Sequence, residues 1–161
     1  MADVTISKGT INRLVKKLDV LSNPTREKDA RSLGALVVRE MKRDIGRLNS
    51  PIRGRGKFPA LKEPYKSRKQ RQVGSDKPDL KLSGDFLKSL GSDTEPRRDG
   101  FATVIGFDDA LSNDKEAGHR KGTNRQRKRP IIPNEREGFN RRISALIENF
   151  FLKRVRDIIR T

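Results

Sequence analysis

The residues that could do chemistry gather between positions 108 and 119. Asp108, Asp109, Asp114 and Glu116 form an acidic cluster, and His119 follows it as the only histidine of the chain. Closely spaced carboxylates are typical ligands of Mg²⁺, as in metal-dependent nucleases. These acids have no flanking apolar strand and no carboxylate pair at a diagnostic spacing. We therefore interpret them as solvated side chains of a loop.

The composition also argues against other catalytic sites. The chain has no cysteine, so a metal site could add only carboxylates to His119. A lone histidine between Gly118 and Arg120 is most simply a structural hydrogen-bonding group. The sequence has no Walker-type phosphate loop and no Ser/His/Asp arrangement. We expect no catalytic residue, no metal and no cofactor, and we expect that the protein is not an enzyme.

Positive charge is the strongest chemical signal. The 161 residues include 38 Lys and Arg against 21 Asp and Glu, which gives a net charge of +17. Such an excess favours polyanions or acidic protein surfaces as partners. Aromatic residues make up only 5% of the chain, so we expect phosphate contact without sequence readout. The residues expected to contact DNA phosphates or an acidic partner are Arg53, Arg55, Lys57, Arg120, Lys121, Arg125, Arg127, Lys128 and Arg129.

The elements that must position these residues predict a single α+β domain spanning 1–161. Apolar residues recur at helical spacing over 10–21 and again from Arg26 to Leu48, so we expect N-terminal helices within 10–48. The apolar face expected on the longer helix comprises Ala30, Leu33, Val37, Met41, Ile45 and Leu48. Within that helix, Gly34 either permits a close helix crossing or is simply tolerated.

Residues 49–78 are expected to form an extended basic loop, because glycine and proline interrupt any periodicity there. We interpret this segment either as a solvated linker or as an arm that orders against a neighbouring subunit or nucleic acid. Its sizeable side chains after Ile52 are Phe58, Leu61 and Tyr65.

Residues 79–133 predict a short helix, a hairpin, a basic loop and an edge strand. Ser83 is expected to cap a single helical turn. Asp99-Gly100 predicts a hairpin turn. The strand that follows, 101–107, has two largely apolar faces, which indicates a central strand covered on both sides.

The remainder of the chain predicts a small antiparallel sheet packed by long terminal helices. Residues 108–118 are expected to form a loop with a short helical turn, and 131–133 an edge strand bordered by prolines. The C-terminal helix, within 134–161, is expected to begin at an Asn134 cap. The residues expected at subunit or partner contacts are Phe58, Leu61, Tyr65, Phe150, Phe151 and Ile158.

Five short motifs follow one another along the chain: Phe58-Pro59-Ala60-Leu61, Leu82 to Leu90, Phe101 to Gly106, Glu116 to Thr123, and Lys128 to Pro133. Their order resembles the virion morphogenesis family of tailed bacteriophages, which includes neck, head–tail joining and tail-completion proteins. Ala60 is inserted relative to the family pattern, and Ile131 stands where a phenylalanine is usual.

The resemblance implies a non-catalytic α+β subunit that assembles as a homo-oligomeric ring, such as a hexamer or a dodecamer, at the head–tail junction of the virion. It implies other neck, portal-adaptor or tail-tube proteins as partners, genomic DNA in the lumen, and synthesis in the host cytoplasm. The alternative is a non-specific nucleic-acid-binding protein of ribosomal or packaging type. We expect no membrane partner, because no apolar run approaches the length of a membrane span and the first residues do not resemble a signal peptide.

Overall fold

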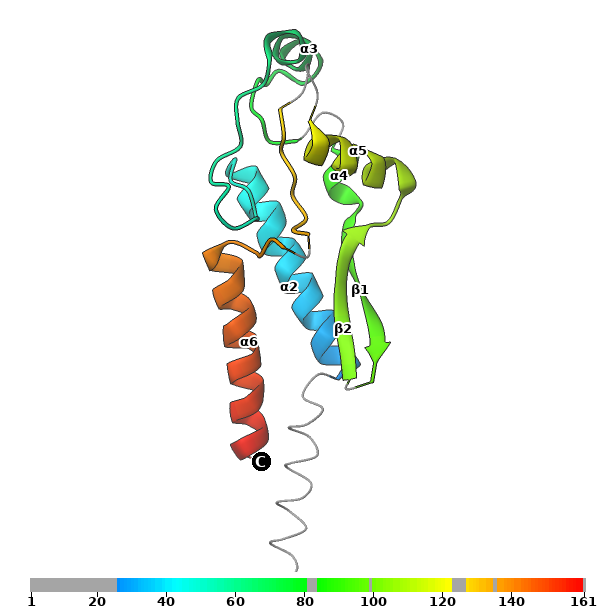
Figure 1. The fold of residues 1–161 in the computed structure, drawn as a ribbon, viewed down its shortest axis with the longest axis vertical. Helices are drawn as coiled ribbons and strands as arrows, with labels where there is room; N and C mark the ends of the chain where they lie inside the picture. Colours follow the sequence, from blue (N-terminus) through cyan, green and yellow to red (C-terminus); the bar gives the residue numbers. More distant parts are fainter. Residues whose placement is uncertain (1–25, 81–83, 99, 123–126, 135, 161) are drawn as a thin grey trace, which may run out of the picture.

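The computed structural model describes residues 26–80, 84–98, 100–122, 127–134 and 136–160. It confirms the α+β class: helix α2 lies between α6 on one side and a two-stranded hairpin on the other (Figure 1). The helix expected over 10–21 lies outside the described residues. The elements are α2 (Glu27–Gly46), α3 (Glu63–Val73), α4 (Asp85–Lys88), β1 (Leu90–Arg97), β2 (Gly100–Phe107), α5 (Ala110–Lys121) and α6 (Arg141–Arg160).

Helix α2 is the centre of the fold because its apolar side chains face both neighbours. The predicted face is confirmed up to Ile45, whereas Leu48 lies beyond the helix end with a φ of 63°. The chain turns there because the Asn49 amide donates to the Asp44 carbonyl at 2.9 Å. The buried apolar residues of α2 are Ala30, Leu33, Val37, Val38, Met41 and Ile45.

Strands β1 and β2 form the predicted antiparallel hairpin, with Leu90 opposite Phe107. The hairpin crosses α2 closely at Gly34. A Cβ atom on Gly34 would lie 2.5 Å from Ser92 Oγ and 2.9 Å from Thr103 Cγ2, which is closer than side chains tolerate. Gly34 therefore permits a close approach and is not merely tolerated, but the element that crosses α2 there is the hairpin and not a second helix.

The expectation of a central strand is wrong. Across the described residues the sheet has two strands, α2 covers one face of it, and Val104 on the other face is 38% exposed. The expected edge strand at 131–133 is also wrong. The amides of both isoleucines in that segment donate to the Glu116 carboxylate instead of a neighbouring strand.

The segment predicted as a structureless basic arm contains helix α3. Pro64 lies in the first turn, where the N–H that proline lacks would have no acceptor within the helix. Gly74 ends the helix in the left-handed conformation. The glycine and proline therefore mark the two ends of a helix. The Lys69 ammonium is buried under α3 and pairs with Asp79.

Two further boundaries differ from the sequence prediction because other side chains act as caps. Asp109 accepts a hydrogen bond from the Ser112 amide at 2.7 Å and caps helix α5 over 110–121, where a loop with only a short helical turn was expected. Asn140 accepts from the Ile143 amide at 3.1 Å, so α6 begins at 141 and not near Asn134.

Helix α4 begins at a glycine. Ser83, the expected cap, lies outside the described residues. Gly84 occupies the N-cap position of α4 with a φ of 88° and provides no side-chain hydrogen bond.

The crossing at Gly34 gives a direct stability test. We expect Gly34→Ala to lower the free energy of unfolding by about 1–3 kcal/mol, because the new methyl group overlaps atoms of the hairpin. Urea unfolding followed by circular dichroism measures this change. Gly46→Ala is the matched control on the same helix, because nothing lies within 4 Å of its Cβ position. Equal effects of the two substitutions would contradict the close crossing.

Candidate functional site

Residues from separate motifs of the resemblance meet in one region of the fold. The ring of Phe86 stacks on that of Phe107, with 4.8 Å between the ring centroids, and lies 5.5 Å from the ring of His119. The Arg129 amide donates to the His119 carbonyl at 2.8 Å. The region therefore joins the short helix, the end of the hairpin, α5 and the segment after α5.

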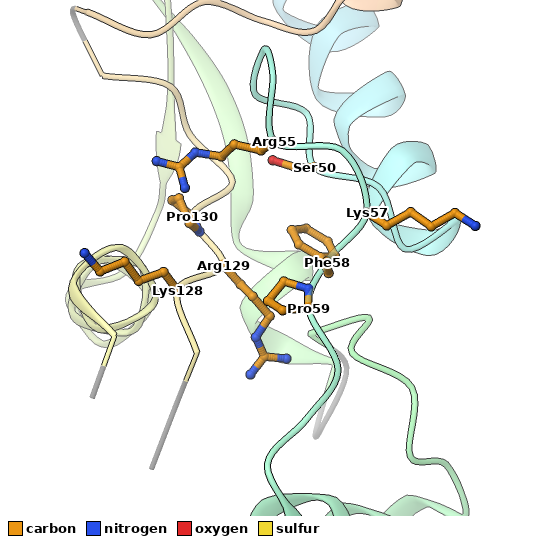
Figure 2. Close-up of a pocket in the computed structure, with 8 residues that line it drawn as sticks. All are labelled: Ser50, Arg55, Lys57, Phe58, Pro59, Lys128, Arg129 and Pro130. Carbon is orange, nitrogen blue, oxygen red and sulfur yellow. The ribbon is translucent and has the colours of Figure 1, made fainter. Parts of the chain in front are cut away.

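A pocket of about 220 Å³ opens beside this cluster, between residues 50–59 and 128–130 (Figure 2). Four of its lining residues are cationic and none is acidic. Figure 2 shows the Lys57 side chain pointing away from 128–130, while the Arg129 guanidinium lies beside Pro59. The lining residues are Ser50, Arg55, Lys57, Phe58, Pro59, Lys128, Arg129 and Pro130.

Arg129 differs from the other cations of the pocket because it is buried. Only 4% of the residue is exposed, and its Nε atom has no hydrogen-bond partner within the described part of the chain. Burial lowers the pKa of Arg129, against a smaller opposite effect of Tyr65. Among the described residues, no carboxylate forms an ion pair with it. A buried charge without a counter-charge is destabilising, which makes Arg129 the candidate ligand-binding group.

Two of the predicted anion-contacting residues are instead occupied within the fold. Arg55 and Arg120 both pair with Glu137, at 2.6 and 2.9 Å. Hydrogen bonding from Arg55, with further bonds from Arg120 and the Asn134 amide, lowers the pKa of Glu137 to about 2 despite the opposing effect of burial. These arginines join the 50–59 loop and α5 to the segment that precedes α6.

Glu137 could have been found from the sequence. The Asn134 side chain accepts from the Glu137 amide, and the Glu137 carboxylate accepts from the Asn134 amide, both at 3.1 Å. This reciprocal pair is a capping box, and its three-residue spacing is a recognisable signal. The box closes a turn before α6 and orients the Glu137 carboxylate.

The expectation of solvated loop acids is wrong for Glu116, which lies in helix α5. Glu116 is only 8% exposed. Its carboxylate accepts from the amides of Ile131 and Ile132 and lies 3.5 Å from Arg120. Burial raises the pKa of Glu116, while these hydrogen bonds act in the opposite direction.

The other three acids of that cluster have different roles. Asp109 caps α5, and its hydrogen bond with Ser112, as the largest effect, lowers its pKa. Asp108 and Asp114 are exposed, as predicted.

The remaining predicted cations are spread over the surface. Arg53, Lys57, Lys121, Arg127 and Lys128 are exposed. Arg125 lies outside the described residues.

The residues expected at subunit contacts divide into two groups. Phe58, Leu61 and Ile158 are each at most 8% exposed, so these side chains belong to the interior of the protomer. The side chains of Tyr65, Phe150 and Phe151 are only partly buried and remain accessible.

Within the part of the chain that the structure describes, no group of three or more acidic, histidine or cysteine side chains could hold a metal ion. The helices of this part are all too short or too polar to cross a membrane. Comparison with known proteins finds no match: no family model, no curated protein and no solved structure is similar to this chain.

The buried carboxylate of Glu116 can be tested by an isosteric change. We expect Glu116→Gln to lower the free energy of unfolding by about 1–3 kcal/mol, because the new amide group would face backbone amides that also donate. Asp114→Asn is the control on the same helix, since Asp114 is exposed. Urea unfolding at neutral pH compares the two variants, and an unchanged midpoint for Glu116→Gln would contradict the role of this carboxylate.

The burial of His119 predicts a pH dependence of stability. Burial, and secondarily the charge of Arg129, lowers the pKa of His119 from 6.5 to about 4. The unfolded chain then binds a proton below pH 6.5 that the folded chain binds only near pH 4. The His119 contribution to stability is thus present above pH 6.5 and is lost progressively down to pH 4, by up to about 3 kcal/mol.

This pH dependence can be measured from unfolding free energies at intervals between pH 7 and pH 5. His119→Gln should show a shallower slope than the wild-type protein, because it lacks the titrating group. Parallel slopes would show that His119 has an ordinary pKa.

Proposed function

We propose that the protein is a structural subunit of a tailed-bacteriophage virion: a ring-forming neck, head–tail connector or tail-completion protein. The observation that carries the proposal is the meeting of the motifs around Phe86, His119 and Arg129. These residues are far apart in the sequence, yet they form one connected cluster with the pocket beside it. Such a cluster supports the resemblance because it gives the separate motifs a common structural role.

Assembly into a ring needs an apolar contact surface, and α6 offers one. Leu152 and Ile159 are 52% and 58% exposed. With the partly buried Val155 they stand at positions i, i+3 and i+7, which places all three on one face of the helix. Exposed apolar side chains arranged on one face are typical of a protein contact surface.

The alternative, a non-specific nucleic-acid-binding protein, is favoured by exposed cations. Helix α3 and the C-terminal end of α5 lie at the same end of the molecule (Figure 1). Six exposed cations form no ion pair with any carboxylate of the described residues: Lys57, Arg68, Arg71, Lys121, Arg127 and Lys128.

The oligomeric state separates these functions. We expect a discrete oligomer whose mass, measured by light scattering, is the same at low and high salt, because an apolar interface is not screened. Leu152→Ser combined with Ile159→Ser should reduce this mass to that of the monomer. Leu111→Ser is the control: Leu111 is 64% exposed but lies on α5.

A monomer at both salt concentrations that binds duplex DNA tightly at physiological salt would favour the alternative. The virion role has its own test in the phage that encodes the chain. Deleting the gene should leave heads and tails that do not join, whereas normal infectious particles would exclude the proposed function.

A further inference from the structure

We propose that the pocket beside Arg129 binds a carboxylate from an acidic, extended segment of a neighbouring virion protein. This inference rests on the proposed function, since it supplies one of the partner contacts that a neck subunit needs. The ligand class is an Asp or Glu side chain, and the binding group is the Arg129 guanidinium.

The first argument is the missing counter-charge. Two other cations of the fold have acidic partners: buried Lys69 pairs with Asp79, and partly exposed Arg120 pairs with both Glu116 and Glu137. Arg129 is nearly as buried as Lys69 and more buried than Arg120, yet among the described residues its Nε atom has no partner and no carboxylate pairs with it. A bound carboxylate would supply the charge and the hydrogen-bond acceptor that this guanidinium lacks.

The second argument is the position of the guanidinium. The pocket has room for a side-chain carboxylate, and apolar groups of Phe58, Pro59 and Pro130 form part of its wall. The phosphates of a DNA duplex lie along a broad, stiff surface, so they reach exposed cations more easily than one that is 4% exposed. A flexible acidic peptide can insert a single side chain, which favours protein over DNA as the partner.

The third argument is the charge at the pocket entrance. Arg55 is neutralised by Glu137 at 2.6 Å, and Lys57 points away (Figure 2). Lys128 remains as an exposed cation next to Arg129 in the sequence, and it forms no ion pair with a described carboxylate. An acidic segment with two carboxylates could thus pair one with Arg129 inside and the other with Lys128 at the rim.

The test uses the full chain and a short amidated peptide of alternating glutamate and glycine. Binding is followed by NMR through the backbone amide signals of His119, Arg129 and Ile131. We expect saturable shifts with the glutamate peptide and none with its glutamine counterpart. Arg129→Met should weaken binding about tenfold or more, because a charged hydrogen-bonded contact is lost.

Arg127→Met is the matched control, since Arg127 is exposed and only two residues away; it should leave peptide binding within about twofold of the wild type. Arg129→Met should also raise the Tm of the free protein, because it removes an uncompensated buried charge. A purely structural arginine would give the opposite shift.

Three results would overturn the inference: equal binding of the two peptides, unchanged binding by Arg129→Met, or a lower Tm in that variant. A loss of duplex-DNA binding by Arg129→Met, without an effect of the glutamate peptide, would reassign the pocket to phosphate. Because the assay does not require a ring, failure of oligomerisation and failure of the pocket are distinguishable.

Discussion

The return of the chain from α5 to α6 depends on one buried carboxylate. The Glu116 carboxylate accepts hydrogen bonds from the amides of Ile131 and Ile132. The Arg129 amide donates to the carbonyl of His119, near the end of α5. These three bonds fix an irregular segment against α5, with Ile131 fully buried. Because the segment is fixed there, Arg129 lies inside the protein while its neighbours Arg127 and Lys128 stay exposed.

Acidic residues have a structural role elsewhere in this basic protein too. On α2, the carboxylates of Glu40 and Asp44 both lie 2.8 Å from the Arg142 guanidinium. Asp44 also accepts from the Asn140 side chain, which caps α6. These contacts place the start of α6 against α2.

Local sequence signals predicted the parts of the fold that depend on local physics. The spacing of apolar residues predicted α2, and the Asp99-Gly100 pair predicted the hairpin. Helix α3 was missed because Pro64 and Gly74 were interpreted as breaks, although they occupy the positions of a helix that tolerate them. The expected strand at 131–133 failed for a non-local reason: its amides have an acceptor fifteen residues earlier in the sequence.

The candidate site was predictable only in part. The cations around 53–57 and 127–129 were identified, but charge spacing does not tell which of them turns inward. Arg55 and Arg120 were expected to meet a ligand and instead meet Glu137. Burial of Arg129 follows from the path of the backbone after α5, which depends on contacts that no local pattern encodes.

The pairing of Glu137 with Arg55 has a consequence for the order of folding. These residues are 82 positions apart, so their contact closes a long loop of chain and carries a large entropy cost. Helix α2 and the hairpin are built from near neighbours and can form first. We therefore expect the Arg55–Glu137–Arg120 bridge to form late in folding, after α2 and the hairpin. It then joins the 50–59 loop and α5 to the segment before α6.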